Sequence, residues 1–130
     1  MKHTKETTMN SFSVTGHGDN GHPSHCHITT TKGIYNIPLS EILFIECRQK
    51  KSLLHFKQEM LTLPIPLYRL KEALPDTLFQ QTHRSFLVNL SNISHIDKQK
   101  DPWTVYFFDS QKCAYISRSF RHHVMKSIGD

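Results

Sequence analysis

The segment Phe79–Leu90, with the sequence FQQTHRSFLVNL, changes character at its middle. Its first half is polar, whereas Phe86–Leu90 is rich in apolar side chains, which favours a buried strand. Between the halves lie residues 82–85, THRS, where an arginine stands among hydroxyl side chains and a histidine. The segment therefore predicts a strand that is approached through a polar, basic connection.

Strand and turn patterns continue upstream of this segment. Apolar runs alternate with turn signals such as Lys32–Gly33, and Pro38–Glu41 resembles one short helical turn. Pairing of neighbouring runs gives two hairpins and one buried strand between them. The upstream strands are expected at His27–Thr31, Ile34–Leu39, Ile42–Cys47, Leu53–Phe56 and Met60–Leu63.

Helical spacing occurs in two short places. Leu67, Leu70 and Leu74 recur at helical intervals before Pro75, and this short helix needs a sheet to lean on. Downstream strands are expected at Ile93–Ile96, Trp103–Phe108 and Cys113–Ile116, followed by a C-terminal helix over Arg118–Ser127. We therefore expect a mainly β fold with one short central helix and a short C-terminal helix.

Length and composition limit the classes of protein. The chain has 130 residues and 37% hydrophobic residues, enough for one domain with one modest core. Its apolar runs are far shorter than the ~20 residues of a membrane-spanning helix, so we expect no membrane insertion. The 3 cysteines do not form an even disulfide framework, which favours the reducing cytoplasm. Residues 1–26 are polar and predict a flexible tail, which leaves 27–130 as the folded domain.

Net charge points to a polyanionic partner. The chain carries +5 at pH 7, and residues 32–130 contain 14 of the Lys and Arg residues against 9 acidic ones. A compact basic domain suggests nucleic acid as its partner, although the same charges can simply solvate a surface. Basic clusters interrupt the strands at residues 48–52, 82–85 and 117–123. Their arginines can offer a bidentate fork to guanine, and their Lys, Ser and His side chains suit phosphates or base edges.

Other functions have weaker signals. His22, His25, Cys26 and His27 are spaced too tightly for a usual structural zinc site, so we expect no metal or cofactor. Cys47, Cys113, Ser85 and Ser119 show no nucleophile–histidine–carboxylate pattern, so we expect no enzyme. The aromatic run at Trp103–Phe108 leaves binding of single-stranded nucleic acid open. A protein-interaction module is a further alternative.

The signature segment resembles the LytTR DNA-binding domain. FQQTHRSFLVN over Phe79–Asn89 is similar to the family pattern F-x-x-x-H-R-S-[YF]-[IL]-V-N. Ile34–Glu46, with IYNIPLSEILFIE, also resembles the family, as do Asn92–Ile96 and Tyr115–Phe120. The resemblance covers residues 27–128, and its C-terminal part is most similar to quorum-sensing response regulators of Gram-positive bacteria.

This resemblance implies an elongated stack of antiparallel sheets that binds double-stranded promoter DNA through loops between strands. It further implies two copies on paired direct repeats. By position, it assigns DNA contacts to Lys50, Lys51, Ser52, His83, Arg84, Arg118, Arg121 and His122. Phe86 and Asn89 match the signature as structural residues, Phe86 in the core and Asn89 as a strand residue that bonds the backbone.

One departure from the family concerns the way in which the activity of the regulator is controlled. Many members carry a receiver domain of a two-component system before this fold, and the 26 residues that precede it here are too few for one. We expect either a stand-alone regulator, held in check by an inhibitory partner protein, or a part of a longer response regulator.

Overall fold

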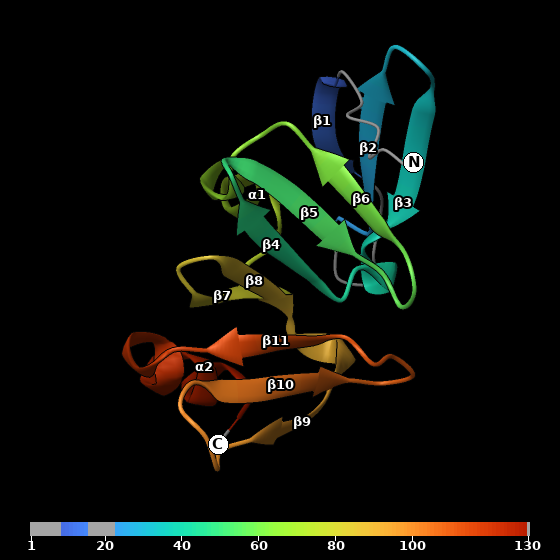
Figure 1. Cartoon of the computed structure of the whole chain (residues 1–130). Coiled ribbons are helices and arrows are strands. Elements are labelled where there is room, and N and C mark those ends of the chain that lie inside the picture. Colours follow the sequence, from blue (N-terminus) through green and yellow to red (C-terminus); the bar gives the residue numbers. More distant parts are fainter. Residues whose placement is uncertain (1–8, 16–22, 130) are drawn as a thin grey trace, which may run out of the picture.

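The computed structural model describes residues 9–15 and 23–129, which form a mainly β protein with two short helices. Its antiparallel sheets are stacked along the long axis of the molecule (Figure 1), as the resemblance to the LytTR domain implies. The strands are β1 (Met9–Thr15), β2 (His25–Thr30), β3 (Ile34–Pro38), β4 (Phe44–Arg48), β5 (Lys51–His55), β6 (Met60–Leu63), β7 (Phe79–His83), β8 (Phe86–Asn89), β9 (Ile93–Asp97), β10 (Trp103–Phe107) and β11 (Cys113–Ile116). The helices are α1 (Leu67–Ala73) and α2 (Arg121–Ser127), with 3-10 turns η1 (Leu39–Glu41), η2 (Leu90–Asn92) and η3 (Arg118–Phe120).

The middle sheet of five strands, in the order β6-β5-β4-β8-β7, is covered on both faces. In β4, Ile45 packs in the cluster shared with β2 and α1, whereas its neighbour Phe44 packs in the cluster shared with β10 and α2. Leu87 and Val88 of β8 divide in the same way. Because successive strand residues point to opposite faces, these continuous apolar runs fill two cores at once.

The polar first half of the signature segment is also a strand, which its composition did not indicate. β7 pairs with β8 and forms an edge of the middle sheet. An edge strand tolerates polar side chains because part of it faces solvent. Thr82 is the exception, since it is fully buried and its hydroxyl donates to the carbonyl of Tyr115 at 2.7 Å.

The prediction of a flexible tail over residues 1–26 is wrong for Met9–Thr15 and for the start of β2. β1 pairs with β2, and β2 pairs with β3, in a sheet of three strands. Phe12 and Val14, two residues apart, pack against the cluster that contains the buried Cys26. This period of two is the strand signal that the polar composition concealed. Residues 1–8 and 16–22 of the expected tail lie outside the described residues.

Both predicted helices are present. In α1, Leu67 and Leu70 are buried against the middle sheet cluster. The C-terminal helix begins later than expected, because Arg118–Phe120 forms η3 before α2, and Ser117 makes no side-chain cap bond. No helix in the described part of the chain is long and apolar enough to span a membrane.

Candidate nucleic-acid interface

Four chain connections meet at one edge of the molecule, on the left in Figure 1, and we call them together the loop edge. They are the β4–β5 turn, the β7–β8 turn, the β9–β10 loop at residues 98–102, and residues 118–122. Short contacts join them in series. The amide of Cys47 donates to Ser85 at 2.8 Å, the amide of Ser117 donates to Thr82 at 2.9 Å, and Arg118 pairs with Asp101 at 2.7 Å. Three basic clusters that are distant in sequence therefore lie on one surface.

The β4–β5 turn places Lys50 in an unusual backbone conformation. Arg48 and Lys51 are opposed in the hairpin, so the turn consists of Gln49 and Lys50, with φ of 55° and 66°. Two residues of positive φ favour Asn-Gly, and side chains larger than these are strained there. The exposed Lys50 thus occupies a position where the turn alone would favour glycine. Lys51 is half-buried at the start of β5.

Ser52 does not belong to the interface, and its prediction as a DNA contact is wrong. Its side chain is fully buried, and its hydroxyl donates to the carbonyl of Ile65 at 2.7 Å. The strand begins at Lys51, two residues before its expected start at Leu53, so Ser52 lies inside the sheet with its side chain buried. Ser52 instead ties β5 to the segment that leads into α1.

The β7–β8 turn presents Arg84 to solvent. Arg84 is exposed, and hydrogen bonds around it fix the turn. The amide of Ser85 donates to Nδ1 of His83 at 3.1 Å, and the side chain of Gln81 donates to the carbonyls of His83 and Arg84 at 3.2 and 3.4 Å. The His83 ring also packs edge-on against Phe86. His83 therefore shapes the turn that carries Arg84, and its own contact with DNA remains a prediction.

The η3–α2 segment contains two arginines with different surroundings. The Arg118 side chain is 78% exposed, whereas that of Arg121 is 25% exposed. The guanidinium of Arg121 lies 4.4 Å from the centroid of the Trp103 ring and donates to Asp101. Asp101 also pairs with Arg118. The exposed His122 follows at the start of α2.

Some residues of the loop edge were not predicted. Asp101 lies between the two arginines, and Lys98 lies 5.0 Å from the Trp103 ring centroid. Lys100 is exposed in the same loop. The sequence marks residues 98–102 only as a connection between strands, because their closeness to residues 118–121 arises when Trp103 of β10 pairs with Ile116 of β11.

Behind the β4–β5 turn, Glu46 links Arg48 to a buried histidine. Its carboxylate accepts from Arg48 at 2.9 Å and from Nε2 of His55 at 3.0 Å. His55 stacks on Phe44 with ring centroids 4.3 Å apart. Burial lowers the pKa of His55 below its ordinary 6.5, and the hydrogen bond that His55 donates to Glu46 only partly opposes this. Protonation would place a second proton on Nδ1, which is buried with no partner among the described residues.

We expect this histidine to make folding stability depend on pH. Below 6.5 the unfolded chain takes up a proton at this residue before the folded chain does, so acid favours unfolding. Denaturant unfolding of the wild type and of His55→Gln, followed over a pH series through 6.5, isolates this residue from the other histidines. The stability of the wild type relative to the variant should fall as the pH falls. A difference that is constant with pH would contradict the assignment.

The structure does not bring the described residues of the possible metal cluster together. Cys26 is buried, while its neighbours His25 and His27 fall on the opposite face of β2. Burial raises the pKa of the Cys26 thiol to about 11, which disfavours the thiolate that metals require. Within residues 9–15 and 23–129 no group of three potential ligands gathers, and His22 lies outside them.

The aromatic run does not form a continuous stacking surface. Phe107 is buried, and the Trp103 ring is approached by Lys98 and Arg121. Tyr106 stacks on His95 with ring centroids 4.7 Å apart. A single exposed ring, Phe108, remains at the far end of the run, where 57% of it is exposed.

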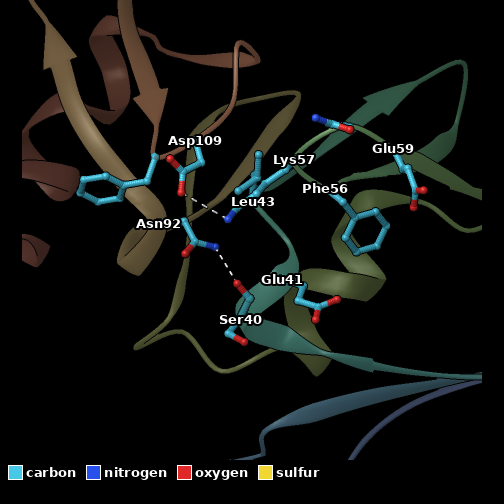
Figure 2. A pocket seen from close by; sticks show the side chains of 10 residues that line it. Ser40, Glu41, Leu43, Phe56, Lys57, Glu59, Asn92 and Asp109 are labelled. Carbon is cyan, nitrogen blue, oxygen red and sulfur yellow. Dashed lines mark hydrogen bonds and ion pairs between the residues drawn. The ribbon is translucent and has the colours of Figure 1, made fainter.

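A hollow at the end of the molecule opposite to the loop edge is lined partly by Phe56, Glu41 and Glu59 (Figure 2). Two pairs of its lining residues bond to each other. Asn92 donates to the carbonyl of Ser40 at 2.9 Å, and Lys57 pairs with Asp109 at 3.5 Å. These bonds join η1 to η2 and the β5–β6 loop to the β10–β11 turn. The hollow therefore lies where the middle sheet meets the sheet of β9, β10 and β11.

The fold and the loop edge together define a class of protein: a mainly β domain that gathers exposed cations from several loops on one edge, a surface that suits a polyanion. The LytTR family model, described as the LytTr DNA-binding domain, matches residues 32–129. The chain therefore belongs to the LytTR family of DNA-binding domains, which are parts of transcription regulators and not enzymes.

Similar proteins agree with this assignment. The transcriptional regulatory protein YpdB of Escherichia coli K12 is 30% identical over 66 residues, which cover 51% of this chain and 25% of YpdB. YpdB of Shigella flexneri matches equally. A LytTr DNA-binding domain from Bacillus cereus superposes with a TM-score of 0.70 at 24% identity, over 82% of this chain and 98% of that domain, and shows the shared fold.

Proposed function

We propose that this domain binds double-stranded DNA with sequence specificity, as the promoter-recognising part of a bacterial transcription regulator in the cytoplasm. The observation that carries the proposal is the convergence of cations from four connections on the loop edge. These side chains are Arg48, Lys50, Lys51, Arg84, Lys98, Lys100, Arg118 and Arg121.

The exposed side chains of the loop edge divide into two expected roles. Arg84 and Arg118 stand on rigid supports, a hydrogen-bonded turn and a 3-10 turn, and have the reach of a guanine-binding fork. Lys50 and the lysines of the β9–β10 loop suit phosphates, which set the position of the protein on the duplex. Arg121, stacked on Trp103, has less freedom to move and suits a backbone contact beside Arg118.

Membership of the family supports further parts of the proposal. Two copies bind paired direct repeats, and the domain acts within a quorum-sensing response regulator of a two-component system or as a stand-alone regulator held by an inhibitory protein. The chain matches a quarter of the length of YpdB.

A selection experiment tests the proposal. Purified protein is incubated with a random duplex library at physiological salt, and the retained DNA is sequenced. We expect a short motif, enriched as two direct repeats at fixed spacing. Folded protein that enriches no motif would contradict sequence-specific duplex binding. Competition by single-stranded DNA as effective as the duplex would favour the single-strand alternative instead.

The turn residue Lys50 allows a test in which binding and stability change in opposite directions. Lys50→Gly should raise the free energy of unfolding by about 1 kcal/mol, because glycine relieves the positive φ. It should also weaken binding to every duplex and reduce the slope of log affinity against log salt by ~0.9, the value of one phosphate contact.

Lys57→Gly is the matched control, since Lys57 is 59% exposed at the opposite end of the molecule. Denaturant unfolding and fluorescence anisotropy over a salt series measure both quantities. A salt slope for Lys50→Gly equal to that of the control would remove Lys50 from the interface.

A further inference from the structure

We propose that Asp101 is a positioning residue that gives the DNA interface its sequence discrimination, by holding Arg118 in place and weakening its attraction to phosphates. The inference rests on the proposed function. It assigns a role in DNA binding to an acidic residue that lies within a basic surface. Asp101 is 47% exposed and contacts both arginines of the η3–α2 segment.

The carboxylate of Asp101 connects Arg118 to the rigid part of the protein. One oxygen, Oδ2, forms an ion pair with Nη2 of Arg118 at 2.7 Å, and the other, Oδ1, accepts a hydrogen bond from Nη2 of Arg121. Arg121 is in turn packed on Trp103, the first residue of β10. The flexible and exposed Arg118 is thereby linked through Asp101 and Arg121 to a sheet.

This link leaves Arg118 able to bind a base. A guanidinium has five N–H donors, and the ion pair with Asp101 occupies one of the two hydrogens of Nη2. The second hydrogen of Nη2, together with the neighbouring Nη1 or Nε, remains as a fork for guanine O6 and N7. An arginine that is already oriented loses less side-chain freedom when it binds. Orientation by Asp101 therefore favours the base contact.

The charge of Asp101 has the opposite effect on contacts that do not depend on sequence. A carboxylate beside Arg118 and Arg121 partly neutralises both, and phosphate attraction falls with the local positive charge. A salt bridge whose arginine is 78% exposed contributes little to folding. The contribution that Asp101 makes through Arg118 is therefore expected in discrimination between duplexes and not in stability.

The test compares Asp101→Asn with Asp109→Asn. Both remove one negative charge, but Asp109 lies at the opposite end of the molecule and is 80% exposed. Fluorescence anisotropy measures binding to the duplex selected by the wild type and to a scrambled duplex of equal length. In Asp101→Asn we expect tighter scrambled binding, weaker selected binding and an affinity ratio lowered by about tenfold, within the range of one lost base contact. Asp109→Asn should keep the ratio within about twofold.

A double-mutant cycle with Arg118→Ala distinguishes action through Arg118 from a general charge effect. In the Arg118→Ala background, Asp101→Asn should change the ratio little. Asp101→Glu, which keeps the negative charge, should retain part of the affinity ratio that Asp101→Asn loses. Thermal unfolding checks that every variant is folded. The role of Asp101 is overturned if Asp101→Asn and Asp109→Asn have the same affinity ratio. It is also overturned if Asp101→Asn lowers the ratio as much in the Arg118→Ala background as in the wild type. A wild type that binds all duplexes alike overturns the proposed function as well.

Discussion

Arg84→Ala is expected to weaken binding to the selected duplex by about 1–3 kcal/mol, the value of one bidentate base contact. The expected loss is large because Arg84 is exposed at the tip of a turn that Gln81, His83 and Ser85 hold by hydrogen bonds. A preorganised arginine loses little freedom on binding. Binding to a scrambled duplex should fall much less, so the preference for the selected motif should relax at one base position.

Lys57→Ala is the control for this prediction, because it removes one exposed positive charge at the end opposite to the loop edge. Fluorescence anisotropy against the selected duplex and single-base variants of it measures both affinity and preference. Equal effects of the two substitutions on the selected duplex would show that Arg84 contributes only general charge. Unfolding curves establish that both variants remain folded.

Asn89→Ala is expected to lower the free energy of unfolding by about 2–4 kcal/mol, because it leaves several buried polar groups with fewer partners. Asn89 is fully buried. Its amide donates to the carbonyls of Leu39 and Ile42 at 3.2 and 2.9 Å, and its oxygen accepts from the amide and hydroxyl of Ser91 at 3.1 and 2.8 Å. One side chain thus joins η1, β8 and η2.

Asn92→Ala provides the matched comparison for Asn89. Asn92 donates to the carbonyls of Ser40 and Ile42 at 2.9 and 3.0 Å but is only half-buried, so water can replace part of what it loses. We expect a loss of about 1 kcal/mol. Urea unfolding followed by circular dichroism measures both variants. A loss in Asn89→Ala no greater than that in Asn92→Ala would contradict a central role for Asn89.

The role of Asn89 also shows how well a signature separates structure from function. The sequence predicts Phe86 as a core residue and Asn89 as a residue that bonds the backbone, and both predictions are confirmed. The same signature predicts an exposed Arg84, which the structure places at the loop edge. Its contact with DNA stays a prediction that the selection experiment and Arg84→Ala will test.

Local sequence determined most of the elements of this protein. Runs of apolar residues and turn signals predict the hairpins from β2 to β6 and the strands β9 to β11, because strand period and turn chemistry are properties of neighbouring residues. The same holds for α1, where leucines recur at helical spacing before Pro75. The basic character of the connections was visible for the same reason.

Only the tertiary structure decided which residues share a surface. β1 needed β2 as a partner to bury Phe12 and Val14, and the polar β7 needed the sheet edge. Ser52 is not part of the interface because β5 begins at Lys51, two residues before its expected start, and Ser52 therefore lies within the covered middle sheet. Asp101 joined Arg118 and Arg121 because strand pairing brought residues far apart in the chain together. Sequence patterns record neighbours along the chain, whereas ion pairs and burial depend on neighbours in space.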